Sequence, residues 1–146
     1  MEAVYEVYRL KQVARKRKWK FDKRITSPES AAEIAQHFIG DEDREVFFQI
    51  CLNTKNEVIA VHRIHVGAIN ASIVHPREAY KVCLLYNACS VIFFHNHPSY
   101  DCTPSNEDLE VTRRLKEAGK ILGIEMLDHI IVSPRGFTSL KEKGKL

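Results

Sequence analysis

Apolar and polar positions follow two different periods along this chain, and turn residues mark where one period gives way to the other. Residues 44–52 are apolar on both faces, which predicts a strand inside a sheet rather than at its edge. The turn residues 53–56 separate this strand from residues 58–66, the expected second strand of a hairpin. Residues 91–97 begin with a β-branched and aromatic run, which predicts a buried strand.

Helical spacing occupies the segments between these strands. Pro28 directly after Ser27 is typical of a helix start, and Gly40 is a stop signal. The other segments with a clear period are two expected helices, residues 76–88 and 105–122, and two expected strands, residues 125–132 and about 137–140. This order of elements predicts one α/β domain, with a mixed sheet packed by helices.

The first 26 residues differ from this domain in pattern and in charge. Residues 4–10 alternate enough to predict a strand, and residues 19–25 are its expected partner across a basic turn. Residues 9–24 carry nine Lys or Arg and one Asp, a net charge of +8, whereas the whole chain has +3. We therefore divide the chain into a basic N-terminal arm or hairpin, residues 1–26, and a domain, residues 27–146.

The basic stretch has two interpretations. It could attract nucleic acid or another polyanion, because clustered lysine and arginine favour such partners. It could instead be a solvated arm or an edge hairpin, in which lysines prevent edge-to-edge strand pairing. The second interpretation is the more ordinary one.

Length and composition are those of one globular domain. The chain has 146 residues, of which 45% are hydrophobic and 28% charged. No apolar run approaches the roughly 20 residues of a membrane span, and the N-terminus lacks the pattern of a signal peptide. The four cysteines show no CxxC spacing, which favours free thiols in a reducing cytoplasm. We expect a cytoplasmic protein without a membrane partner.

The candidate chemistry lies at the end of the 91–97 strand. His95 and His97 occupy alternate positions of the strand, so both imidazoles can point to one side. Ser105 opens the following helix, and Asp108 lies in its first turn. Two imidazoles and one carboxylate leave a fourth position open, which is typical of a catalytic zinc site rather than a structural one.

Asp108 has a second interpretation. Ser105-x-x-Asp108 is close to a capping box, in which the acid accepts a hydrogen bond from the N-cap amide. The helix dipole also favours a carboxylate at this position. A metal-bound oxygen is not free to cap, although the other oxygen of the same carboxylate could do so. The two upstream histidines favour the metal-ligand interpretation.

A hydrolytic zinc site also needs a general base. The chain has no HExxH motif, so the base must come from another part of the fold. Glu45 opens a strand that is otherwise apolar, which places its carboxylate either at an exposed edge or in a pocket. The rival candidates are Glu42, Glu57 and Glu107.

These residues together resemble a known motif. Glu45, His95-x-His97-Pro98, Ser105 and Asp108 are similar to the JAMM (MPN+) metallopeptidase motif. His-Asn-His-Pro-Ser, Thr-Pro-Ser-x-x-Asp and Leu-Asp-His-Ile-Ile at 127–131 more closely resemble the bacterial RadC family, from about residue 24 onward. The resemblance implies a JAB domain related in architecture to the cytidine deaminase-like zinc enzymes.

The resemblance also implies roles for the site residues. His95, His97 and Asp108 would bind one zinc ion per chain. Glu45 would hold and deprotonate the catalytic water, and Ser105 would hydrogen-bond the developing oxyanion. The implied activity is zinc-dependent hydrolysis of peptide or isopeptide bonds in a protein or peptide substrate.

Two alternatives to this activity stay open. The RadC family name carries a DNA repair label, which with the basic stretch indicates a DNA-associated accessory protein. A catalytically silent interaction module is the other alternative, but the complete set of site residues speaks against it.

Two features depart from the RadC pattern. The length leaves no space for an N-terminal helix-hairpin-helix segment, so we expect a short stand-alone form. Tyr100 replaces the usual glycine after His-Pro-Ser, and its ring could narrow access to the site. Asp128 and His129 have two interpretations. They are a pair beside the site, or His129 is a hydrogen-bonded structural histidine.

Overall fold

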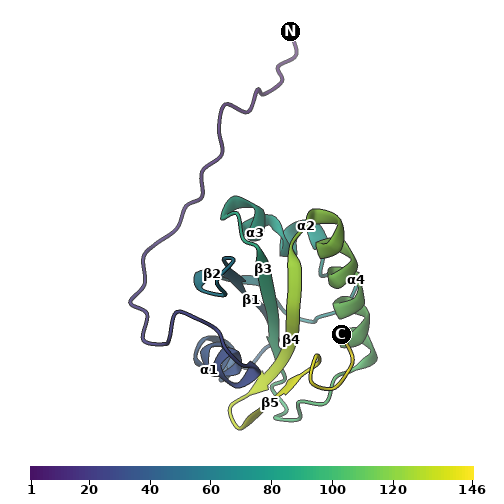
Figure 1. Ribbon diagram of the computed structural model, residues 1–146. Helices are drawn as coiled ribbons and strands as arrows, with labels where there is room; N and C mark the ends of the chain where they lie inside the picture. The colour runs from purple at the N-terminus through teal and green to yellow at the C-terminus, as the bar shows by residue number, and fades with distance from the viewer.

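A five-stranded mixed sheet in the order β2-β1-β3-β4-β5 forms the centre of the computed structural model, which describes all residues, 1–146 (Figure 1). β1 pairs antiparallel with both β2 and β3, β3 runs parallel to β4, and β4 pairs antiparallel with β5. The strands are β1 (Val46–Leu52), β2 (Val58–Val66), β3 (Ser90–Asn96), β4 (Glu125–Ser133) and β5 (Gly136–Ser139). The predicted fold class, a mixed sheet packed by helices, is confirmed.

Helices cover both faces of the sheet (Figure 1). α1 packs on one face, and α2, α3 and α4 pack on the other. The helices are α1 (Pro28–Ile39), α2 (Pro76–Ala79), α3 (Lys81–Leu85) and α4 (Asn106–Leu122). Because both faces are covered, every residue of β1 and of β3 is buried, as the apolar character of both segments predicted.

The crossover between β3 and β4 positions the candidate site. Parallel neighbours in a sheet need a connection that returns along the sheet, and α4 supplies it here. Ser105 caps the start of α4, and Gly123 ends it in the left-handed conformation with φ 76°. The loop of residues 97–105 joins the end of β3 to the first turn of α4.

The prediction of one continuous helix over residues 76–88 is wrong. Tyr80 separates α2 from α3, with φ −98° and ψ −4°. Its side chain is fully buried, its hydroxyl donates to the Leu115 carbonyl at 2.6 Å, and its ring packs edge-on against Phe93. The helical pattern could not show this break, because the contacts that place Tyr80 come from α4 and β3.

The predicted N-terminal hairpin is also wrong. Residues 4–10 form no strand, and the β-pairing of the chain before α1 is limited to an isolated bridge between Arg24 and Glu57. Trp19 and Phe21 pack against the α1 side of the core, where Trp19 stacks on Phe38. The second half of the expected hairpin thus uses its aromatic side chains for packing on the domain. The first half lies exposed as an extended arm (Figure 1).

All four cysteines are free thiols, and the Sγ atoms of Cys51 and Cys83 lie 3.7 Å apart in the core. None of the helices combines the length and the hydropathy that a membrane crossing needs.

Candidate metal centre

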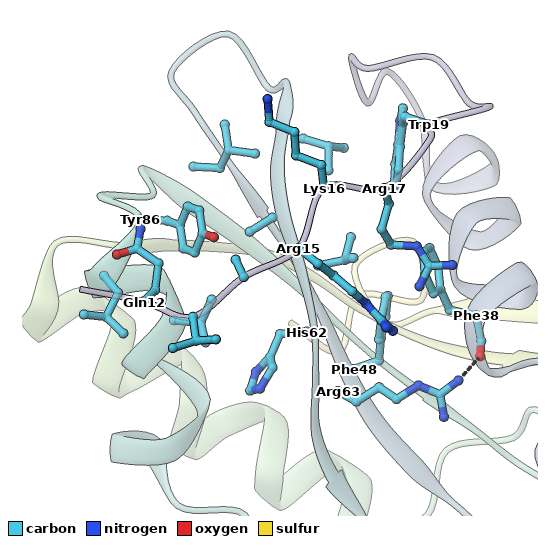
Figure 2. Close-up of a pocket in the computed structure, with 18 of the residues that line it drawn as sticks. Gln12, Arg15, Lys16, Arg17, Trp19, Phe38, Phe48, His62, Arg63 and Tyr86 are labelled. Carbon is cyan, nitrogen blue, oxygen red and sulfur yellow. Dashed lines mark hydrogen bonds between the residues drawn. The ribbon is translucent and has the colours of Figure 1, made fainter.

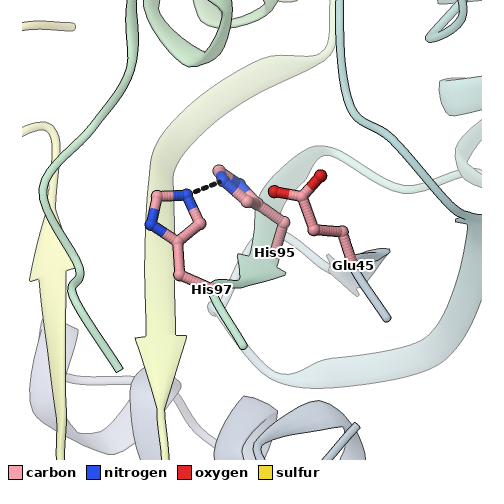
Figure 3. A group of neighbouring side chains, drawn as sticks. All are labelled: Glu45, His95 and His97. Atoms are coloured by element: carbon pink, nitrogen blue, oxygen red, sulfur yellow. Dashed lines mark hydrogen bonds between the residues drawn. The ribbon is translucent and has the colours of Figure 1, made fainter. Parts of the chain in front are cut away.

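The end of β3 brings two imidazoles together over the first turn of α4. His95 is fully buried and His97 is half-buried, and their Nε2 atoms lie 3.0 Å apart (Figure 3). The Asp108 carboxylate contacts both rings: Oδ1 lies 3.1 Å from His95 Nε2, and Oδ2 lies 3.2 Å from His97 Nε2. Three electron-pair donors from two elements therefore converge on one point.

The spacing of these donor atoms, two ring nitrogens and the two oxygens of Asp108, is close to that around a zinc ion. Nitrogen and oxygen ligands about 2.0–2.1 Å from a tetrahedral zinc are separated from one another by about 3.3–3.4 Å. The separations of 3.0, 3.1 and 3.2 Å approach this value. Imidazole and carboxylate are also donor types that zinc accepts, so the residues fit the ion.

Glu45 precedes β1 and reaches the same site from the neighbouring strand. One carboxylate oxygen of Glu45 and one ring nitrogen each of His95 and His97 lie within 4.8 Å of one another. Its carboxylate points toward His95 (Figure 3), and Oε2 accepts a hydrogen bond from the Ile69 N–H at 3.3 Å. Glu45 is half-buried and directly precedes an interior strand, so it does not lie at an exposed sheet edge.

The three rival acids lie elsewhere. Glu42 pairs with Arg63 at 2.6 Å, and Glu57 accepts a hydrogen bond from Asn53 in the β1–β2 turn. Glu107 is exposed on the first turn of α4. Only Glu45 among the four candidates joins the histidine pair.

Asp108 caps α4 and also contacts both imidazoles. Oδ2 accepts the Ser105 N–H at 2.8 Å, and the Ser105 hydroxyl accepts the Asp108 N–H at 3.1 Å, which completes a capping box. Burial raises the pKa of Asp108. Hydrogen bonds from His95, His97 and the Ser105 amide outweigh burial, and the pKa stays well below its usual range. Asp108 is therefore ionised.

The sequence analysis missed the role of Asn96, which lies between the two histidines. Because side chains alternate along a strand, Asn96 points to the α1 face, away from both imidazoles. Its Oδ1 accepts the Val46 N–H at 2.7 Å, and its Nδ2 donates to the carbonyls of Glu42 and Arg44. Asn96 thus fixes the backbone on both sides of Glu45. A buried asparagine inside an apolar strand was the available signal.

The side chains of Asp128 and His129 make contacts in different parts of the structure. Asp128 turns away from the histidine pair and accepts hydrogen bonds from the Ser139 hydroxyl and the Lys141 amide. His129 instead lies 2.8 Å from His95, between Nε2 of His129 and Nδ1 of His95. Complete burial lowers the pKa of His129 well below its ordinary value, so its ring is neutral. His129 is therefore both buried and in direct contact with a candidate ligand.

This α/β fold, with a His-x-His pair and an acid at the start of the crossover helix, is a domain with a candidate metal site. Comparison with protein families gives the class a name. Residues 25–145 match the RadC-like JAB domain, and the chain belongs to that family.

Curated relatives agree with this assignment. A UPF0758 protein of Desulforamulus reducens is 51% identical over 120 residues, which cover 82% of this chain and 53% of the relative. A UPF0758 protein of Shouchella clausii is 53% identical over 120 residues, covering 82% of this chain and 52% of the relative. The chain thus spans about half the length of the curated relatives it matches.

Tyr100 has a backbone conformation that suits the glycine expected at this position from the sequence resemblance. Tyr100 has φ 68°, a left-handed conformation that glycine adopts freely and that costs other residues about 1–2 kcal/mol. Its amide donates to the His97 carbonyl at 3.1 Å, and the Arg135 guanidinium lies 5.7 Å from its ring centroid. This cation–π contact offsets part of the backbone cost. The Tyr100 ring is exposed, on the loop that follows His97.

The hydrogen bonds of Asn96 lead to a stability prediction. Asn96→Ala removes the acceptor of the buried Val46 amide, and we expect a loss of about 1–3 kcal/mol in the free energy of unfolding. Urea denaturation of the metal-free protein measures it. Asn70→Ala is the control, because the Asn70 side chain bonds only within an exposed turn. An equal, small effect of both substitutions would contradict this role of Asn96.

Proposed function

We propose that this domain is a zinc-dependent hydrolase of amide bonds, acting on peptide or lysine isopeptide bonds. The observation that carries the proposal is the convergence of His95, His97 and Asp108 at separations of 3.0–3.2 Å, with Glu45 beside them. Structural zinc sites use four protein ligands, whereas hydrolytic ones use three and keep a position open. Asp108 is the third ligand in this proposal because it contacts both imidazoles, and Glu45 is then the general base.

The outer nitrogen of His97 supports a ligand role. Its Nδ1 lies 2.7 Å from the Asp101 carbonyl oxygen, which can only accept, so Nδ1 carries the proton. The neutral ring then presents the lone pair of Nε2 toward His95 and Asp108. Three lone pairs at this spacing repel one another unless a cation or protons lie between them. The hydrogen bond with Asp108 raises the pKa of His97, so the carboxylate favours positive charge at this position.

The protein's own groups supply the acid–base steps. A bound zinc ion would acidify a water molecule and polarise the scissile carbonyl. Ile69 N–H holds one Glu45 oxygen, and the other oxygen is free to take a proton from water and deliver it to the leaving nitrogen. The Ser105 oxygen accepts the Asp108 amide, which leaves the Ser105 hydroxyl proton free to stabilise an oxyanion.

Metal content tests the ligand set. We expect the purified protein to hold about one zinc per chain, and His97→Ala to lose it, because two ligands alone bind zinc weakly. Elemental analysis after dialysis gives the stoichiometry. His37→Ala is the control, since His37 lies on α1 across the sheet. Zinc retained at full stoichiometry in the His97 variant would show that the ion binds elsewhere.

Glu45→Gln tests the general base separately from the metal. The amide keeps the shape of the side chain but cannot take a proton, so we expect turnover to fall by about 10²- to 10⁴-fold with zinc content unchanged. The assay uses zinc-loaded protein with fluorogenic peptide and lysine-isopeptide libraries. Glu42→Gln is the matched control, because Glu42 pairs with Arg63 outside the site. A Glu45→Gln variant as active as its parent would rule out the proposed base.

A second candidate function, nucleic-acid association, is favoured by the exposed arm. None of the ion pairs involves a lysine or arginine of residues 9–24, so their charges are unneutralised. Figure 2 shows the arm passing over β2. Arg15, Lys16 and Arg17 are residues of this part of the arm. Unpaired cations on an extended segment can follow a phosphate backbone and release its counterions.

Charge reversal tests this second function. We expect duplex DNA binding that weakens with salt, and a shallower salt dependence when Lys16, Arg17 and Lys18 are changed to Glu, because fewer phosphate contacts remain. Fluorescence anisotropy at several salt concentrations measures both. The control reverses Lys120, Lys143 and Lys145, three exposed lysines of the domain. An equal loss in both triple variants would mean that net charge, and not the arm, attracts DNA.

A further inference from the structure

Two buried residues, Thr112 and His129, connect the candidate ligand Asp108 to the candidate ligand His95 by hydrogen bonds. The Thr112 hydroxyl lies 2.7 Å from the Asp108 carbonyl oxygen and 2.6 Å from His129 Nδ1. His129 Nε2 lies 2.8 Å from His95 Nδ1, and His95 Nε2 lies 3.1 Å from Asp108 Oδ1. All four residues are at most 2% exposed. The contacts form a closed ring of hydrogen-bonding groups.

Protons can be placed on this ring in two ways, because a neutral imidazole has one donor and one acceptor nitrogen. In the first arrangement, Thr112 donates to His129 Nδ1 and His129 donates from Nε2 to His95 Nδ1. The His95 proton then lies on Nε2, toward Asp108. This arrangement occupies the nitrogen that a metal ion would need.

In the second arrangement every donor is reversed. Thr112 donates to the Asp108 carbonyl, His129 donates from Nδ1 to the Thr112 oxygen, and His95 donates from Nδ1 to His129 Nε2. The His95 Nε2 lone pair is then free to bind a metal. The Asp108 carbonyl is what makes this arrangement complete, since it gives the Thr112 proton an acceptor and leaves no buried donor unpaired.

We propose that Thr112 and His129 are positioning residues that hold His95 in its Nδ1-protonated tautomer, with Nε2 presented to the metal. The inference rests on the proposed function, since it needs a metal at His95. It extends that function inward, to residues that touch neither the metal nor a substrate. Partners of this kind fix the orientation and the tautomer of a ligating histidine, and their loss typically weakens metal binding about 10- to 100-fold.

The surroundings of His129 leave these two partners as the groups that fix its protons. Phe47 packs edge-on against its ring, with ring centroids 5.6 Å apart, and offers no polar atom. Both ring nitrogens are nevertheless paired, one with Thr112 and one with His95. His97 achieves the same tautomer more simply, through the Asp101 carbonyl at the exposed side of the site. His95 is fully buried, so its partner must come from inside the domain.

Thr112→Val is the decisive substitution, because it keeps the shape of the side chain and removes the hydroxyl. The His129 Nδ1 proton then has no acceptor in the metal-competent arrangement. We expect the Kd for zinc, measured by chelator competition, to rise about 10- to 100-fold. Thr112→Ser keeps the hydroxyl and should restore the parent Kd. Ser139→Ala is the control. It also removes a buried hydroxyl, but one that is bonded to Asp128 and not to His129.

The tautomers are read directly by nitrogen-15 NMR of histidine-labelled protein, loaded with zinc. We expect the proton on Nδ1 in both His95 and His129. A proton on His129 Nε2, or a Thr112→Val variant with an unchanged Kd and only a lower melting temperature, would overturn the positioning role. A parent protein that binds no zinc would remove the proposed function, and this inference with it. An unchanged Kd in the Thr112 variant removes the inference alone.

Discussion

The double use of the Asp108 carboxylate is the constraint on which both the helix and the site depend. Its oxygens cap the first turn of α4 and contact the imidazoles of His95 and His97 at the end of β3. A helix cap and a metal ligand normally compete for an acid. Here the carboxylate has two oxygens, each with more than one acceptor direction, so both contacts form. The start of α4 is thereby fixed over the end of β3.

Alternation along β3 gives three successive residues different tasks. His95 and His97 point to the α4 face, where Asp108 and His129 meet them. Asn96 points to the α1 face and holds the backbone around Glu45. Because β1 and β3 are neighbouring antiparallel strands, Phe47 pairs with His95. Glu45, two residues before Phe47, therefore lies at the same end of the sheet as the histidines. One short strand end thus orients the imidazoles and the candidate base together.

The inner and outer sides of the site are lined by different kinds of residue. The inner side, with Thr112 and His129, is apolar in its surroundings and fully paired. The outer side carries the Asp101 carbonyl, the exposed ring of Tyr100 and the free hydroxyl of Ser105. The positioning role proposed for Thr112 and His129 therefore belongs to the inner side, where both residues are buried. Under the proposed function, a substrate would approach from the outer side, where Tyr100 has a left-handed backbone.

The sequence by itself determined the sheet and helix order, the capping of α4 and the convergence of His95, His97 and Asp108. These follow from local rules: strand alternation, helix periodicity and short connections. Only the tertiary structure decided the place of Glu45 among four acids, the parting of Asp128 from His129, the break at Tyr80 and the unpaired N-terminal arm. Each of these depends on contacts between residues distant in sequence, such as Asn96 with the backbone before β1. No local period of the chain encodes such contacts.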